Sequence, residues 1–505
     1  MDRKAFIKTT TAGALAWKFA PKRFAGIDDL PRASPESQGI SSAGLRKFLD
    51  AANESHLSFH SFMLLRHGKV VAEGWWKPYA PQFKHSLFSL SKSFTGTAIG
   101  LLVGEGKLDI ETPILSFFPG VTPHEGLAHM TIRHLLTMTT GQQGELFPKL
   151  IAAHKPWTQV FLEEPLVSEP GTQFAYNTAS TYMLGVIVTK VTGELLEKYL
   201  TPRLFEPLGI RDHDWQISPD GYNTAGYGLR LRTEDIAKFG QLYLQNGKWK
   251  DRQVIAESWV REATKAQVKS ASPNGPDWNY GYGYQFWRSS HGAFRGDGYY
   301  GQYCLVMPEQ DAVVVITGEI GPMQQELDLV WANILPAMQA GALPENPAEF
   351  SALRQELQSL VLAIPKSSTH SLRPGGKYAL APNAFSLPSV TFVFSAEGCT
   401  LNFPAFSLRF GWENWILNEG SRPYPFPLGN SFPMTSALAG TATWLNADTL
   451  QLNLQRTEAM NGDRITCTFS NESVTMEFLN SIAEKSQGQD APESRPPLIG
   501  SLIAA

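Results

Sequence analysis

Two pairs of apolar runs, one near each end of the first two thirds of the chain, have the pattern of β-hairpins. The first pair is 61–66 and 70–74, separated by His-Gly-Lys, and the second is 301–307 and 312–317, separated by Pro-Glu-Gln-Asp. Short apolar runs on either side of a turn that contains glycine or proline are typical of hairpins. The second pair is almost wholly apolar, which predicts central strands covered on both faces.

The residues between these hairpins carry apolar positions at helical spacing. In 89–105 apolar side chains recur every three or four residues, and 131–138 and 179–192 repeat this spacing. We therefore predict that strands from both ends of residues 30–342 form one antiparallel sheet, with helices packed between and around it.

Beyond residue 342 the pattern changes twice. The proline-flanked amphipathic stretch 348–362 predicts a connecting helix inside a linker of residues 343–372. Residues 373–482 contain short alternating runs between turn residues, which predicts a small all-β domain, either a barrel or a sandwich. Residues 483–505 are predicted to be a tail that is polar and contains proline up to a last apolar patch. The clearest strand signals in the all-β domain are 390–394, 399–403, 449–454, 465–469 and 474–478.

Length and composition agree with two domains and exclude some classes of function. The chain has 505 residues, more than one compact core holds. Its 43% apolar and 18% charged residues and net charge of −4 leave no basic surplus for binding nucleic acid. No apolar run reaches the roughly 18 residues of a membrane-spanning helix, so membrane insertion is not expected. The sequence leaves the oligomeric state open.

The first residues have the layout of an export signal. A basic start, Arg3-Lys4-x-Phe6-Ile7-Lys8, precedes a short and weakly apolar stretch. It resembles a twin-arginine signal whose second arginine is replaced by lysine. We predict that residues 1–26 are an export signal and that the protein is periplasmic or exported. The alternative is an unstructured cytoplasmic N-terminus.

The three cysteines, Cys304, Cys399 and Cys467, lie far apart in the sequence. An odd number at this spacing predicts neither a disulfide framework nor a metal site. Cys399 and Cys467 either pair in an oxidising compartment or stay free, and buried free thiols are the favoured interpretation because free cysteine is usually a small core residue.

The segment 88–96, Phe-Ser-Leu-Ser-Lys-Ser-Phe-Thr-Gly, carries the most chemical information. Ser89 and Lys92 are three residues apart, so on a helix they lie on one face and bring a hydroxyl beside an amine. A hydroxyl is a weak nucleophile until a base removes its proton, and a desolvated lysine has a pKa low enough to help. Two fixed residues also recur by chance, so an isolated match of this kind is weak evidence, and the alternative is a solvated helix start.

Further motifs follow in order along the chain. Residues 130–141 read Met-Thr-Ile-Arg-His-Leu-Leu-Thr-Met-Thr-Thr-Gly, and 170–178 read Pro-Gly-Thr-Gln-Phe-Ala-Tyr-Asn-Thr. With 88–96 they closely resemble the serine β-lactamase and penicillin-recognising superfamily, specifically its class C-like branch of esterases, D-amino-acid peptidases and 6-aminohexanoate-dimer hydrolases. This resemblance implies an α/β fold with an antiparallel sheet flanked by helices and an all-helical lobe. Further matching segments are 204–209, 229–240, 280–287 and 298–302.

The resemblance implies a role for each matching side chain. Ser89 is the nucleophile that becomes acylated, and Lys92 is its base or proton relay. Tyr176 matches the first position of the family's Tyr-x-Asn/Ser element. A phenol near a lysine ammonium is expected to have a lowered pKa and to pass protons between the serine and the leaving group. Thr178 replaces the usual Asn or Ser and is expected to contact the substrate, while the neighbouring Asn177 is expected to turn away.

The third family element shows the largest departure. β-Lactamases and transpeptidases carry a Lys-Thr-Gly or His-x-Gly strand whose cation binds the substrate carboxylate, whereas this chain reads Gly296-Asp297-Gly298. The missing cation and the adjacent acid argue against anionic β-lactam substrates. The backbone N–H groups of Tyr299 and Ser89 are expected to form the oxyanion hole.

Aromatic residues surround this element in the sequence. Tyr282 and Trp287 are expected to bind the substrate together with Thr178 and Gly298, although an aromatic cluster is equally typical of a plain core. The other aromatic candidates for such a pocket are Tyr280, Tyr299 and Tyr300.

The leading hypothesis is a serine hydrolase, without metal or cofactor, that cleaves a small-molecule carboxylic ester or amide through an acyl-enzyme on Ser89. One alternative is a penicillin-binding D,D-carboxypeptidase or weak β-lactamase, which the missing cation disfavours. Another is a non-catalytic ligand-binding or sensor module. The sequence contains neither a Gly-x-Ser-x-Gly elbow nor a His-Glu-x-x-His motif, and His85 and His134 are predicted to be structural.

Overall fold

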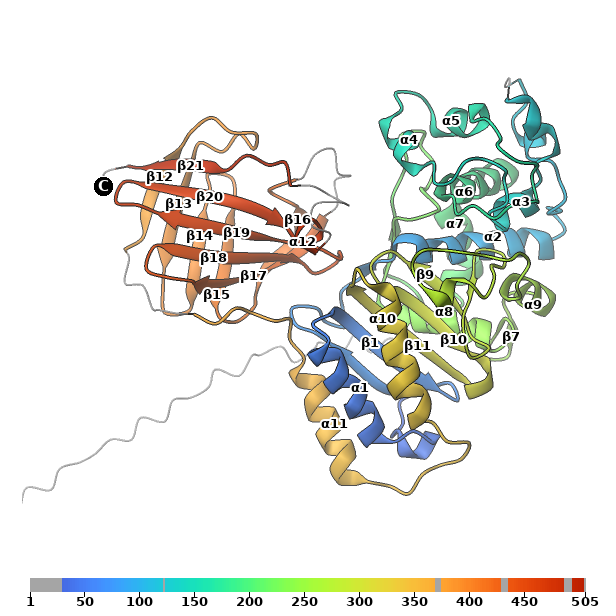
Figure 1. Cartoon of the computed structure of the whole chain (residues 1–505), viewed down its shortest axis with the longest axis horizontal. Helices are drawn as coiled ribbons and strands as arrows, with labels where there is room; N and C mark the ends of the chain where they lie inside the picture. Colours follow the sequence, from blue (N-terminus) through green and yellow to red (C-terminus); the bar gives the residue numbers. More distant parts are fainter. Residues whose placement is uncertain (1–29, 121–122, 368–373, 428–434, 486–492, 504–505) are drawn as a thin grey trace, which may run out of the picture.

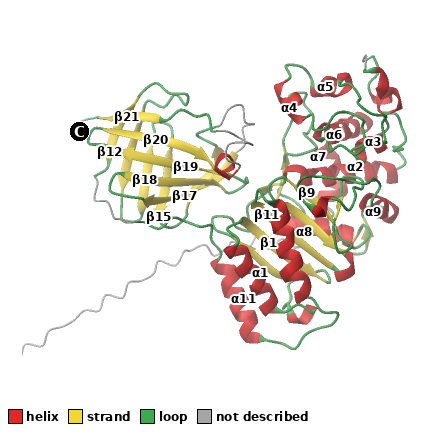
Figure 2. Cartoon of the chain, viewed as in Figure 1, coloured by secondary structure: helices red, strands yellow, loops and turns green. Residues whose placement is uncertain are grey.

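The computed structural model describes residues 30–120, 123–367, 374–427, 435–485 and 493–503, and the predicted export signal lies outside these ranges. Two bodies follow one another along the chain, a mixed α/β unit and a body made almost wholly of strands (Figures 1 and 2). Within the described ranges, no helix combines the length and the apolar character needed to cross a membrane.

A six-stranded antiparallel sheet forms the centre of the α/β unit, in the order β2-β1-β11-β10-β9-β8. Both predicted hairpins are present, and β1 pairs directly with β11, so the two ends of the unit meet in the middle of the sheet. Every residue of β10 and β11 is buried, as their apolar composition predicts. The strands are β1 (Ser58–Arg66), β2 (Lys69–Trp75), β8 (Trp287–Arg288), β9 (Phe294–Gly298), β10 (Gln302–Met307) and β11 (Ala312–Glu319).

Helices cover both faces of this sheet and form a separate lobe (Figure 1). On one face lie α1 (Ser42–Glu54), α10 (Met323–Leu329) and α11 (Pro347–Ser359), and on the other lies α8 (Thr233–Leu244). The lobe packs around α2 (Ser91–Gly104) and α6 (Thr178–Thr192). Its other helices are α3 (Ile132–Leu136), α4 (Phe147–Ala152), α5 (Trp157–Glu163), α7 (Leu196–Leu200) and α9 (Glu257–Thr264). The short strands of the α/β unit are β3 (His85–Ser86), β4 (Asp214–Trp215), β5 (Leu229–Leu231), β6 (Lys248–Trp249) and β7 (Arg252–Gln253).

The helix predicted as part of the linker belongs to the α/β unit instead. In α11 the side chain of Leu353 is buried, and Glu349 and Glu356 both pair with Arg46 of α1. The boundary predicted at residue 342 is therefore wrong, because the apolar face of α11 covers the sheet rather than bridging two domains.

The second body is a closed barrel. Nine strands form the ring β15-β14-β13-β12-β21-β20-β19-β18-β17, which a parallel pairing of β15 with β17 closes, and β16 pairs with β17 outside the ring. Cys399 and Cys467 point into its core and are free thiols, as the favoured interpretation expected. The strands are β12 (Gly376–Leu380), β13 (Ser389–Phe394), β14 (Gly398–Asn402), β15 (Ser407–Trp412), β16 (Ile416–Pro423), β17 (Thr435–Trp444), β18 (Thr449–Arg456), β19 (Gly462–Phe469), β20 (Ser473–Asn480) and β21 (Leu498–Leu502).

The prediction of a plain tail after residue 482 is wrong. The short helix α12 (Ser481–Lys485) follows β20, and β21 then returns to the barrel and pairs with both β12 and β20. Leu498 and Gly500 are buried in the barrel wall, so this last apolar patch completes the ring.

The barrel contacts the α/β unit close to the segment that carries Ser89. Tyr79 donates a hydrogen bond to the carbonyl of Ala459 at 2.9 Å and accepts one from Gln455 at 2.6 Å. Arg230 of β5 donates to the carbonyl of Thr435 at 2.8 Å. The barrel therefore braces the loop that contains Tyr79 and also β5, which pairs with β3 immediately before the serine segment.

Candidate active site

Ser89 lies on a single 3₁₀ turn, Phe88–Leu90, immediately before α2. The turn is anchored by the Leu87 N–H, which donates to the carbonyl of Leu229 at 3.0 Å. Phe88 has a φ of 47°, an uncommon left-handed conformation for a residue with a side chain, and such strain is often found at functional sites. The hydroxyl of Ser89 is thus held at the positive end of a 14-residue helix.

Lys92 lies one turn later, and its Nζ is 2.9 Å from the Ser89 Oγ, which confirms the predicted contact. The same Nζ lies 3.0 Å from Thr178 Oγ1 and 2.9 Å from the carbonyl oxygen of Gly226. The Gly226 carbonyl can only accept, and the Thr178 hydroxyl already donates to Glu145, so Lys92 donates to both. A neutral amine then has its lone pair left for the Ser89 proton.

The charge state of Lys92 follows from its surroundings. Its side chain is only 1% exposed, and burial lowers the pKa of Lys92 to about 8, against the opposing effects of the nearby Glu145 and Asp297 carboxylates. A substantial fraction of the amine is therefore neutral near pH 8, which is the form that can accept a proton from Ser89.

Tyr176 is the second group at the serine, because its interaction with the Ser89 side chain lowers the pKa of the phenol against the larger effect of burial. The Lys92 Nζ lies 4.9 Å from the centre of the Tyr176 ring. The sequence-based expectation of a lowered pKa is wrong for Tyr176, because burial of the phenol raises its pKa well above the usual value. Tyr176 is therefore a neutral phenol that can donate a proton, and Lys92 is the better base.

Tyr282 and Trp287, which are predicted to bind substrate, instead pack against the ring of Tyr176. They are 1% and 6% exposed, so neither offers a surface to a ligand. The Trp287 ring is stacked on Tyr176 with centroids 5.5 Å apart, and Tyr282 meets Tyr176 edge-on at 6.3 Å. The aromatic cluster is core, as its alternative interpretation allowed, and Tyr280 and Tyr299 are the exposed members.

Strand β9 carries the departure from the family pattern and packs tightly against the serine segment. A Cβ added at Gly296 would lie 2.2 Å from the Leu90 side chain, and one at Gly298 would lie 2.1 Å from the carbonyl oxygen of Leu87. A side chain at Gly296 would therefore require the buried Leu90 side chain to shift. Tyr299 follows directly at the end of β9, so its backbone belongs to the strand end that adjoins this segment.

The Asp297 side chain points away from this close contact, and its charge is compensated by a neighbouring arginine. Its carboxylate accepts a hydrogen bond from the Arg295 Nε at 3.0 Å, and the Arg295 guanidinium lies 4.4 Å from the centre of the Trp278 ring. Burial raises the pKa of Asp297. The acid noted in the sequence is therefore part of a buried pair rather than an open ligand.

Thr178 does not present a free hydroxyl to a substrate, because Lys92 and Glu145 occupy it. Glu145 is the functional-site residue that the sequence did not reveal. Its exposed carboxylate accepts the Thr178 hydroxyl at 2.7 Å and the Thr178 N–H at 2.9 Å. Asn177 turns away as expected and fixes the Glu145 loop by accepting from the Leu146 N–H. Glu145 lies in an irregular loop without a periodic pattern, and its position shortly after the 130–141 motif is the signal that could have identified it.

The two histidines singled out in the sequence have structural roles, as predicted. His85 Nε2 lies 3.0 Å from His60 Nδ1, and burial lowers the pKa of His85 to about 4. His134 accepts the Thr131 N–H through Nδ1 at 3.1 Å and thereby caps α3. Neither contacts Ser89 through a hydrogen bond in the described residues.

Comparison with known proteins agrees with this geometry. The sequence model of the family described as Beta-lactamase matches residues 46–337, which is more than half of the chain. A 6-aminohexanoate-dimer hydrolase from Paenarthrobacter ureafaciens is 28% identical over 287 residues, covering 50% of this chain and 71% of the relative. A beta-lactamase from Escherichia coli strain K12 is 24% identical over 190 residues, and the match spans 34% of this chain and half of the relative.

Solved structures share the fold of the α/β unit. A Bacillus anthracis protein assigned provisionally to the 6-aminohexanoate-dimer hydrolases aligns with a TM-score of 0.52 and 23% identity, over 64% of this chain and 90% of that protein. EstCE1, described as a hydrolase with promiscuous acyltransferase activity, aligns with a TM-score of 0.50 and 18% identity, over 58% of this chain and 98% of that protein. The chain therefore belongs to the serine β-lactamase and penicillin-recognising superfamily, and it is a serine hydrolase.

Proposed function

We propose that the protein hydrolyses small carboxylic esters or amides through an acyl-enzyme on Ser89. The observation that carries this proposal is the 2.9 Å contact between the Ser89 hydroxyl and the amine of Lys92. Lys92 is buried, and its burial lowers its pKa to about 8. A neutral amine at this distance is the base that a serine nucleophile needs.

The reaction follows from the roles of the three polar groups. Lys92 takes the proton of Ser89 as its oxygen attacks the substrate carbonyl, and the resulting oxyanion is held by the backbone N–H groups of Ser89 and Tyr299. The intermediate collapses to an acyl-serine, and the leaving alcohol or amine receives a proton from the neutral phenol of Tyr176, which Lys92 replenishes. A water molecule then attacks the acyl-serine by the same proton transfers and releases the carboxylic acid.

Substrate charge is the second part of the proposal. Gly296 carries no cationic side chain, and the exposed Glu145 carboxylate places negative charge beside Lys92. Both features favour neutral or amine-bearing substrates over anionic ones. A linear 6-aminohexanoate dimer, the substrate named for one relative, contains an amide, a terminal amine and a terminal carboxylate. We extend only its amine-bearing amide part, as amides and esters with a cationic amine, to this chain.

A substrate panel tests the proposal. Short esters and neutral or amine-bearing amides are expected to exceed penicillins and cephalosporins at least tenfold in kcat/KM, which corresponds to about 1.4 kcal/mol of transition-state binding. The Ser89→Ala variant, folded by thermal melt, is the control for each activity. Efficient hydrolysis of β-lactams would contradict the substrate assignment, and the absence of turnover on every ester, amide and lactam would favour a binding module.

A further inference from the structure

The outer edge of β2 is covered at both ends and open between them. At its start, Val70 pairs with residues 31–33 through two backbone hydrogen bonds of 2.8 and 3.0 Å. Just beyond its end, Lys77 pairs with residues 360–362 through two bonds of 2.9 and 3.1 Å. Both short segments run parallel to β2. They are two ends of an incomplete seventh strand of the sheet, with a gap in the middle.

The backbone groups exposed in this gap can be identified from the strand register. Trp76 donates to the carbonyl of His60, so the backbone groups of Trp76, Gly74 and Ala72 face β1, while those of the residues between them face outward. A register shift before Ala72 turns Val70 outward again. The N–H and C=O groups of Glu73 and Trp75 therefore point to the outer edge. In the part of the chain that the structure describes, no backbone or side-chain group bonds to them. An edge of this kind is a ready template for another strand.

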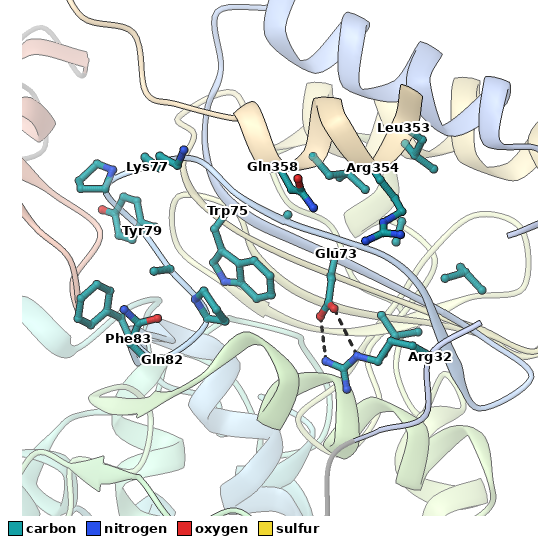
Figure 3. A pocket seen from close by; sticks show the side chains of 18 of the residues that line it. Arg32, Glu73, Trp75, Lys77, Tyr79, Gln82, Phe83, Leu353, Arg354 and Gln358 are labelled. Atoms are coloured by element: carbon teal, nitrogen blue, oxygen red, sulfur yellow. Dashed lines mark hydrogen bonds and ion pairs between the residues drawn. The ribbon is translucent and has the colours of Figure 1, made fainter. Parts of the chain in front are cut away.

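A cavity of about 940 Å³ runs along this open edge, and we call it the edge cleft (Figure 3). All six residues from Val70 to Trp75 line it, so it follows the strand rather than one face of the sheet. Leu353 and Leu357 of α11 form one wall, and the aromatic rings of Tyr79 and Phe83 lie at the far end of the strand. Trp415 of the barrel also lines the cleft. The lining is mostly apolar, which suits alternate apolar side chains of an added strand.

The charged groups of the edge cleft indicate an acidic ligand. Arg32 is neutralised by Glu73 and Glu234, at 2.9 Å from each. Lys77 and Arg354, by contrast, lie at opposite ends of the gap and pair with no carboxylate among the described residues (Figure 3). A ligand with a carboxylate near either end would supply the missing counter-charge.

We propose that the edge cleft binds an extended acidic segment of a partner protein, which adds to the outer edge of β2 and completes the seventh strand. Val70 and Lys77 are seven residue steps apart, or roughly 23 Å at about 3.3 Å per step, so four to five added residues fill the gap, roughly the length of a short strand. A peptide supplies the alternating donors and acceptors that Glu73 and Trp75 need, whereas a lipid chain does not. The site does not involve Ser89 and is independent of the proposed hydrolysis.

The test uses the peptide fluorescein-Asp-Val-Ile-Val-Asp-amide, labelled at its N-terminus, titrated with the full-length protein and followed by fluorescence anisotropy. Main-chain bonds dominate strand addition, so binding is expected to tolerate the choice of apolar residues. A peptide of the same sequence with N-methylated alternate amides keeps the side chains but loses the donors, and it is expected to bind at least tenfold more weakly. Equal affinity for both peptides, or no saturable binding of the parent up to millimolar protein, would overturn the proposal.

Two substitutions of Glu73 distinguish the contribution of its backbone N–H from that of its carboxylate. Glu73→Ala and Glu73→Pro both remove the carboxylate, but only proline removes the outward N–H, and proline is tolerated where an edge N–H faces outward. Binding is expected to survive in Glu73→Ala and to fall at least tenfold in Glu73→Pro. A double Lys77→Ala, Arg354→Ala variant is expected to weaken binding and reduce its salt dependence. Equal affinity of the two Glu73 variants, both folded by thermal melt, would refute strand addition.

Discussion

The pH dependence of hydrolysis follows directly from the environment of Lys92. Its pKa of about 8 leaves about 9% of the amine neutral at pH 7 and about 90% at pH 9. If the neutral amine is the base, kcat/KM on a neutral ester rises about tenfold across this range and then levels off. The profile is measured with an ester whose own hydrolysis is subtracted at each pH.

Replacing Glu145 by glutamine tests the cause of that profile. The Glu145 carboxylate raises the pKa of Lys92 against the larger effect of burial, so Glu145→Gln removes a charge that favours the ammonium form. The rising limb of kcat/KM is expected to move to lower pH. Relative to its own plateau, the variant is then more active at pH 7 than the wild type. Because ester hydrolysis is followed on a neutral substrate, loss of attraction for a cationic substrate does not enter the measurement.

A matched control distinguishes this effect from a general change in charge. Glu163 of α5 is an exposed carboxylate that pairs with Lys155 and has no contact with Lys92, so Glu163→Gln is expected to leave the limb in place. A limb that is unchanged in Glu145→Gln, or that moves to higher pH, would refute the assignment of Lys92 as the titrating base.

Further predictions concern individual side chains. Ser89→Ala is expected to abolish turnover. Ser91→Ala is expected to keep turnover but to lose about 1 kcal/mol of unfolding free energy, because the Ser91 hydroxyl accepts a hydrogen bond from the buried Leu229 N–H. Activity assays and thermal melts distinguish the two variants. Tyr176→Phe is expected to lower kcat by about 10²–10⁴-fold, and a loss under tenfold would remove Tyr176 from the proton path. Lys92→Ala is expected to be at least as damaging as Tyr176→Phe in the same kcat assay, because it deletes the base. Gly296→Lys is expected to lower the unfolding free energy by about 1–3 kcal/mol, because the new side chain overpacks against Leu90. The variant is expected to gain no β-lactamase activity. An unchanged melting temperature would contradict the packing seen at β9.

The fold was predictable wherever one strong local pattern dominated. The hairpins of β1 with β2 and of β10 with β11 follow from apolar runs around a turn, and α6 follows from its helical spacing. The tail was misread because β21 is a short apolar patch after a polar stretch, and only its long-range pairing with β12 and β20 makes it a strand. Similarly, α11 looked like a linker because its sequence does not say which surface its apolar face covers.

The candidate site was predictable where residues lie close in sequence. Ser89 and Lys92 form one turn of helix, so their contact was implied by spacing, and Tyr176 was identified by its motif. The pKa of Tyr176 was misjudged because burial, which depends on Trp287 and Tyr282 from a distant segment, outweighs the nearby ammonium. Glu145 was missed for the same reason, since its role depends on a tertiary contact with Thr178.

The proposed mechanism requires that Ser89 becomes acylated during turnover. The most direct measurement is mass spectrometry of the enzyme quenched within one turnover of a slowly hydrolysed p-nitrophenyl ester, followed by digestion and mapping of the acylated peptide. We expect the acyl mass on Ser89 in the wild type, its decay at the rate of turnover, and its absence in Ser89→Ala. Acylation of any other residue at the turnover rate, or turnover with no acyl-serine at any time, would contradict it.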